Sequence, residues 1–144
     1  MVSGMASDSH TWNLVFLQLL IEELGYNVVN LGPCVPDELL VSECCQIAPL
    51  MIVISSVNGH GHQDGMRVIG QLRDCAQLAR TPTVIGGKLG ISGGQDMQSL
   101  DELRAAGFDA VFEDGVSGVV EFKKFAMALP GSATVVVEKN RIPR

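Results

Sequence analysis

Apolar residues recur along this chain in two alternating patterns. Short runs rich in Val, Ile and Leu alternate with longer segments whose apolar residues recur at helical spacing. The run from Leu50 to Ile54 is almost purely apolar and β-branched, as expected of a central parallel strand buried on both faces. The pattern predicts strands over 2–6, 26–31, 50–54, 83–85 and 110–112, and helices over 14–24, 36–47, 63–78, 96–106 and 116–128.

Capping residues support these predicted boundaries. Gly25 and Gly107 follow helical segments at positions where helices commonly stop. Pro36, Asp37 and Glu38 place a proline and two acids in a first helical turn, where both are favourable.

Five strand-helix units predict an α/β fold. We expect a flavodoxin-like (Rossmann-like), doubly wound sheet of five parallel strands in the order 2-1-3-4-5, with helices on both faces. The 144 residues suffice for one domain, which we place at 1–129. Residues 130–144 are predicted to form a tail, in which Thr134 to Val137 is either an extra edge strand or a partner-binding arm.

Charge and composition narrow the function classes. A formal net charge of −6 argues against a sequence-independent nucleic-acid binder, which needs a basic face. No apolar run approaches the ~20 residues of a membrane-spanning helix, and no secretory leader is visible. The four cysteines lack zinc-type spacing, and we interpret them as reduced residues of a cytoplasmic protein.

The candidate chemistry lies after the strands, because ligands of open parallel sheets bind beyond the carboxyl ends. Small and polar residues follow the first, third and fourth predicted strands, over 7–13, 55–61 and 86–90. None of these segments has a phosphate-loop or G-x-G-x-x-G pattern. Within the first, Asp8 precedes His10 by two residues, so its carboxylate can fix the imidazole tautomer and free the other ring nitrogen as a ligand or base.

Three of these motifs together resemble a known family. Asp8-x-His10-x-x-Asn13, Ser55-x-Val57 and Gly86-Gly87 resemble the D-x-H-x-x-G, S-x-L and G-G signature of cobalamin-binding domains of the base-off/His-on type. The resemblance is strongest to the small subunits of glutamate mutases and covers the chain to about Phe125. Asn13 stands where the family has glycine, and Val57 where it has leucine.

The resemblance implies a role for each matching residue. His10 is the axial cobalt ligand, Asp8 orients it, and the nucleotide tail of the cofactor enters a slot between the first helix and the sheet. Ser55 is expected to hydrogen-bond the base of that tail, and Asn13 adds a polar side chain where the tail should pass. The candidate cofactor-binding residues are Ser7, Asp8, Ser9, His10, Thr11, Asn13, Ser55, Ser56, Val57, Gly59, Gly86, Gly87, Lys88, Leu89 and Gly90.

The resemblance also implies the activity. Adenosylcobalamin would supply the radical for a 1,2-rearrangement, with L-glutamate to 3-methylaspartate as the default substrate assignment. No catalytic residue is expected on this chain alone. The amino-acid substrate would bind mainly to a larger TIM-barrel subunit in a heterotetramer, with neither nucleic acid nor membrane as a partner.

Two alternatives stay open from the sequence. The first is a binding module without mutase activity, either a corrinoid carrier for methyl transfer or a cobalamin sensor. The second is a receiver or flavodoxin-like domain without cobalamin. A receiver needs clustered acids after its first and third strands, whereas this chain has Ser55 and Ser56 after the third.

Overall fold

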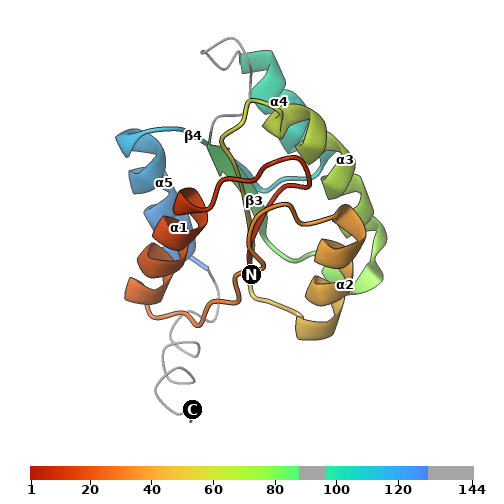
Figure 1. Cartoon of the computed structure of the whole chain (residues 1–144), viewed down its shortest axis with the longest axis horizontal. Helices are drawn as coiled ribbons and strands as arrows, with labels where there is room; N and C mark the ends of the chain where they lie inside the picture. Colours follow the sequence, from red (N-terminus) through yellow and green to blue (C-terminus); the bar gives the residue numbers. More distant parts are fainter. Residues whose placement is uncertain (88–96, 130–144) are drawn as a thin grey trace.

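The chain forms a four-stranded parallel sheet with helices on both faces (Figure 1). The computed structural model describes residues 1–87 and 97–129. The strands are β1 (Val2–Gly4), β2 (Ile52–Ser56), β3 (Thr83–Gly87) and β4 (Ala110–Glu113), in the order β1-β2-β3-β4. The helices are α1 (Trp12–Glu23), α2 (Asp37–Ile47), α3 (Gly61–Asp74), α4 (Met97–Ala106) and α5 (Val116–Met127), with a short 3-10 helix, η1 (Ala76–Leu78).

The sheet separates two apolar layers. Helices α1 and α5 lie on one face, and α2, α3 and α4 lie on the other (Figure 1). Side chains alternate along β2, so Ile52 and Ile54 pack in the layer of α2, α3 and α4, whereas Val53 packs in the layer of α1 and α5. The buried strands thus carry apolar side chains on both faces, which explains their near-continuous apolar runs. No helix in the described ranges is both long and apolar enough to cross a bilayer.

The predicted α/β class with a parallel sheet is confirmed, but the prediction of five strands in the order 2-1-3-4-5 is wrong. The segment 26–31 forms only an isolated parallel bridge between Asn30 and Val2. It lies along the free edge of β1, where the Val2 N–H donates to Val29 O at 2.8 Å and the Leu31 N–H donates to Val2 O at 2.9 Å. Because β1 has only three residues, the segment 26–31 finds few backbone groups with which to pair. The positive φ of Gly32 (86°) then turns the chain away from the sheet edge.

Several boundaries differ from their predictions. Helix α1 begins at Trp12, so Asn13 lies on a helix and not in the preceding loop. Helix α3 begins at Gly61 and ends at Asp74, because Cys75 is extended (ψ 117°) and separates it from η1. Strands β2 and β3 continue to Ser56 and Gly87. The predicted tail, 130–144, lies outside the described residues.

The hydroxyl of Tyr26 connects the segment 26–31 to α5. Buried Tyr26 donates from its hydroxyl to Ala126 O at 2.6 Å. We expect Tyr26→Phe to lower the free energy of unfolding by about 1 kcal/mol, because Ala126 O loses its short hydrogen bond and keeps the 3.4 Å bond from the Leu129 N–H. Urea denaturation measures this, and an unchanged free energy would show that the Tyr26 hydroxyl adds no net stability.

Gly87 ends β3 where no side chain fits. Its φ is 103°, and a Cβ built there would lie 2.1 Å from Ser56 O. We expect Gly87→Ala to destabilise the protein by more than about 1 kcal/mol, from backbone strain together with this clash. Gly70 within α3 is the control, because an added Cβ there meets nothing within 4 Å. Gly70→Ala should stabilise by up to about 1 kcal/mol, and equal effects of both changes on thermal unfolding would contradict the steric argument.

Candidate functional site

A buried carboxylate organises the loop after β1. The side chain of Asp8 is only 1% exposed. Its Oδ1 accepts hydrogen bonds from the His10 backbone N–H at 3.0 Å and from His10 Nδ1 at 2.7 Å, and its Oδ2 accepts one from the Val57 N–H at 2.7 Å. Burial by itself would raise the pKa of the Asp8 carboxyl, but these hydrogen bonds hold its pKa below the ordinary value. Asp8 is therefore an anion held in place by donors from two loops.

His10 presents one ring nitrogen outward. The hydrogen bond to Asp8 places the proton on Nδ1, which leaves the lone pair on Nε2. The side chain is 57% exposed, and the structure gives Nε2 no hydrogen bond within the ranges it describes. An imidazole held this way by a carboxylate is a good metal ligand, because the carboxylate fixes its tautomer and raises its basicity.

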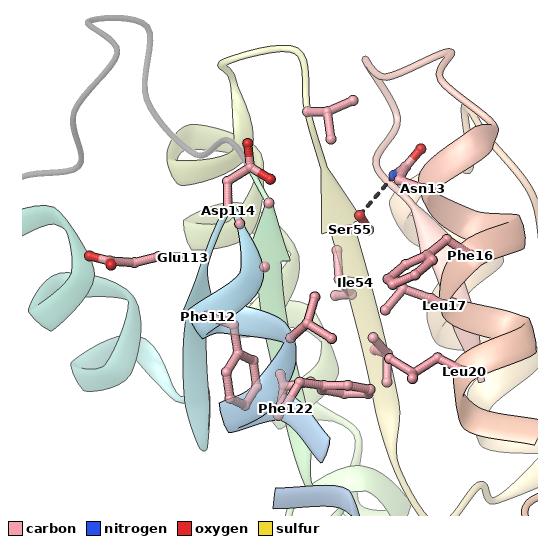
Figure 2. A pocket seen from close by; sticks show the side chains of 18 residues that line it. Asn13, Phe16, Leu17, Leu20, Ile54, Ser55, Phe112, Glu113, Asp114 and Phe122 are labelled. Atoms are coloured by element: carbon pink, nitrogen blue, oxygen red, sulfur yellow. Dashed lines mark hydrogen bonds between the residues drawn. The ribbon is translucent and has the colours of Figure 1, made fainter. Parts of the chain in front are cut away.

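A cavity of about 130 Å³ lies beside this loop, between α1, α5 and the sheet (Figure 2). Its lining is mostly apolar, and Phe112 and Phe122 meet edge to face there with ring centroids 5.5 Å apart. Ser55, Glu113 and Asp114 contribute polar groups. The lining residues are Asn13, Phe16, Leu17, Leu20, Val53, Ile54, Ser55, Val57, Val84, Gly86, Gly87, Phe112, Glu113, Asp114, Gly115, Gly118, Val119 and Phe122.

A row of small residues leaves room over the sheet. Ser55 of β2 pairs with Gly4 of β1 and with Gly86 of β3, so no long neighbouring side chain covers it. A Cβ on Gly86 would lie 3.3 Å from Phe112 O, closer than neighbours normally approach. The cavity exists at this level of the sheet because glycines flank Ser55.

Asn13 occupies the end of the cavity nearest the loop. Its Nδ2 donates to Ser55 Oγ at 2.7 Å (Figure 2). Its Oδ1 is buried and has no hydrogen-bond partner among the described residues. A buried carbonyl oxygen without a donor costs free energy, so the Asn13 side chain lacks a hydrogen bond that its buried Oδ1 needs.

The structure brings part of the predicted set to the cavity. Asn13, Ser55, Val57, Gly86 and Gly87 line it, and Asp8 reaches it through the Val57 N–H. The predicted residues Lys88, Leu89 and Gly90 lie outside the described residues.

The remaining predicted residues lie away from the cavity lining. Ser9 and Thr11 are exposed, and Thr11 precedes α1 without a side-chain cap. Gly59 has a φ of 89° in the turn before α3. Ser7 and Ser56 both contact the Asn58 side chain.

Sequence reasoning missed the α5 side of the cavity. Asp114 and Gly115 follow β4 at the same carboxyl edge as the predicted loops, so the strand rule could have included them. Phe112, Val119 and Phe122 gave no separate signal, because apolar residues at these spacings also suit an ordinary core.

Sequence comparison finds relatives of one kind. No protein-family model matches the chain. It is 32% identical over 108 residues to glutamate mutase sigma subunit 2 of Haloarcula marismortui, covering 75% of this chain and 72% of that protein. It is 30% identical over 112 residues to the glutamate mutase sigma subunit of Carboxydothermus hydrogenoformans, covering 77% of this chain and 80% of that protein.

Solved structures share the fold. A cobalamin-binding protein from Desulfitobacterium hafniense superposes with a TM-score of 0.68 at 17% identity, covering 86% of this chain and 57% of that one. The monomethylamine corrinoid protein of Methanosarcina barkeri gives 0.69 at 18% identity, covering 88% and 55%. The chain thus spans little more than half the length of these two proteins. A putative response regulator from Chloroflexus aurantiacus gives 0.62 at 15% identity, covering 88% and 96%, so these similarities establish the fold alone.

The sequence similarity decides between the families that share this fold. It extends over most of both chains. The chain belongs to the family of glutamate mutase sigma subunits.

Proposed function

We propose that this chain is the cobalamin-carrying small subunit of a glutamate mutase-like carbon-skeleton mutase, with His10 as the cobalt ligand. The observation that carries the proposal is the Asp8–His10 pair, which holds Nδ1 and leaves Nε2 outward at the carboxyl edge of the sheet. A neutral imidazole is a suitable ligand for a transition metal such as cobalt.

The chemistry of the cavity lining supports binding of the nucleotide tail of the cofactor. A nucleotide tail needs an apolar space with a few polar groups, and the cavity offers aromatic walls with the Ser55 hydroxyl at its loop end. Asn13 lies in the same place, and its buried Oδ1 has no partner among the described residues. We assign Ser55, Val57, Gly86 and Gly87 to tail binding, whereas the Asn13 side chain limits the space for the tail.

The chain's own residues would bind and orient the cofactor. Asp8 holds the proton on Nδ1 and so keeps Nε2 available as a ligand. Phe112 and Phe122 exclude water from the tail. Adenosylcobalamin, when bound, supplies the radical chemistry of the rearrangement.

The substrate would bind to a partner. Among the described residues, the cavity lining has no lysine or arginine to pair with the carboxylates of an amino-acid substrate. The sigma-subunit family supports a second, larger subunit that supplies this site. We propose a TIM-barrel partner, a heterotetramer, and activity only in the complex, with L-glutamate as substrate.

A carrier or sensor of corrinoids without mutase activity is the competing proposal. The folds of corrinoid proteins support it as well. Family membership favours the mutase subunit, because the relatives identified from sequence are named as glutamate mutase sigma subunits.

Titration of the purified chain with hydroxocobalamin tests the proposal. We expect the visible spectrum to change to the base-off/His-on form, and His10→Ala to abolish this change, because it removes the Nε2 ligand. His60→Ala is the matched control, since exposed His60 lies in the neighbouring loop and does not line the cavity. A wild-type chain that leaves the spectrum unchanged, or a response retained in His10→Ala, would refute the ligand assignment.

Asn13 should reduce the affinity for the tail. Asn13→Gly removes the side chain that fills the loop end of the cavity and occupies the Ser55 hydroxyl. We expect hydroxocobalamin to bind several-fold more tightly, at a stability cost of about 0.3 kcal/mol from replacing asparagine by glycine within a helix. Val15→Gly in α1 is the control for that cost, because Val15 does not line the cavity. Weaker binding by Asn13→Gly would show that Asn13 contributes to the site.

A further inference from the structure

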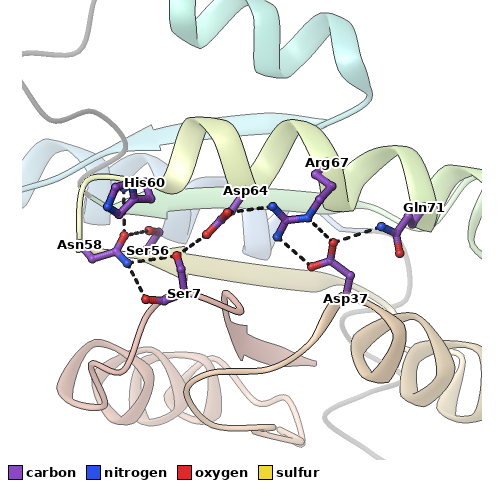
Figure 3. Close-up of polar contacts among 8 residues, drawn as sticks. All are labelled: Ser7, Asp37, Ser56, Asn58, His60, Asp64, Arg67 and Gln71. Atoms are coloured by element: carbon purple, nitrogen blue, oxygen red, sulfur yellow. Dashed lines mark hydrogen bonds and ion pairs between the residues drawn. The ribbon is translucent and has the colours of Figure 1, made fainter.

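Two buried aspartates share one arginine beside the loop that follows β1. Asp37, in the first turn of α2, is 8% exposed, and Asp64, in the first turn of α3, is 6% exposed. Arg67 Nε and Nη2 donate to Asp37 Oδ2 and Oδ1 at 2.6 and 3.2 Å, and Nη1 donates to Asp64 Oδ1 at 3.0 Å (Figure 3). Buried carboxylates are costly unless they are paired, and this pairing fixes both of them.

The second oxygen of Asp64 reaches the loop that follows β1. Ser7 Oγ donates to Asp64 Oδ2 (Figure 3). Ser7 immediately precedes Asp8, so this bond fixes the backbone from which the Asp8–His10 pair projects. The anchored loop is thereby connected to α3 and, through Arg67, to α2.

The same serine joins the loop after β2. Asn58 Nδ2 donates to Ser7 O at 2.9 Å and to Ser7 Oγ at 3.2 Å, and Asn58 Oδ1 accepts from the His60 N–H at 2.9 Å. Asp8 and Ser7 thus attach the first loop to the second at neighbouring positions, since Asp8 accepts from the Val57 N–H.

We propose that Asp64 is a positioning residue for the His10 ligand. Supported by Arg67 and Asp37, it holds Ser7 and so fixes the orientation in which Asp8 presents the His10 ring. Asp64, Arg67 and Asp37 do not line the cavity, so their effect on the cofactor is indirect. His10 is more than half exposed, and its position therefore depends on how firmly its loop is anchored. This inference rests on the proposed function.

The test compares variants of the full chain in titrations with hydroxocobalamin. Ser7→Ala and Asp64→Asn should each raise the dissociation constant about tenfold, the change expected for losing a hydrogen bond to a charged group. Each should also lower the fraction of bound cofactor that shows the His-on spectrum. The double variant should bind hydroxocobalamin no more weakly than the single variant that has the lower affinity, because both changes remove the same hydrogen bond. Ser7→Thr keeps the hydroxyl and should restore wild-type behaviour.

Asp109→Asn controls for a loss of stability alone. Asp109 also accepts from an arginine, Arg73 Nη2 at 2.9 Å, and from the Thr83 N–H at 2.8 Å, but at the amino end of β4. It should lower the melting temperature and leave both the affinity and the spectrum unchanged.

Two outcomes would overturn the positioning role. The first is wild-type affinity and spectrum in Ser7→Ala and Asp64→Asn while His10→Ala still loses the His-on form, which leaves the proposed function intact. The second is an equal effect of Asp109→Asn. If the wild type itself does not bind hydroxocobalamin, the proposed function fails and this inference fails with it.

Discussion

Burial of the Asp8 carboxylate is the constraint on which the site depends. A carboxylate removed from water must be surrounded by donors, and Asp8 finds them in its own loop and in the Val57 N–H of the next. The hydrogen bonds of Asp8 therefore hold the loops after β1 and β2 together. The same bonds determine which nitrogen of His10 is protonated. The orientation of the His10 ring and the packing of these two loops thus depend on one buried carboxylate.

Because side chains alternate along β2, its neighbouring residues have different roles on the two faces of the sheet. Ser55 faces the cavity under α1 and α5, whereas the next residue, Ser56, hydrogen-bonds Asn58 beside the polar groups that hold Ser7. One strand thus contributes to the space for a ligand and to the support of the loop. A shift of one residue in the register of β2 would exchange the two roles.

Much of this arrangement could be predicted from the sequence. Leu50 to Ile54 predicted a central strand, and the Asp8-x-His10 spacing predicted the contact between carboxylate and imidazole. The prediction of a strand over 26–31 was wrong because the pairing of this segment depends on the length of β1. The composition of residues 26–31 carries no information about that length. Asn13 was placed in a loop because the predicted helix was begun at Leu14, from the spacing of its apolar residues. Thr11 is a residue type that favours the N-cap, although its side chain makes no capping hydrogen bond in the structure. In the Asp37–Arg67–Asp64 cluster, only the i,i+3 pair of Asp64 and Arg67 is local to one helix, and Asp37 joins this pair through the packing of α2 on α3.

The start of α1 at Trp12 has a spectroscopic consequence. Trp12 is the only tryptophan of the chain, it is 83% exposed, and it lies two residues from His10. The tryptophan fluorescence of this protein therefore comes from a single point beside the carboxyl edge of the sheet. Any ligand or subunit that covers that edge would change the emission, whereas events at the opposite edge would leave it unaltered. The chain carries its own optical reporter for the surface where its loops converge.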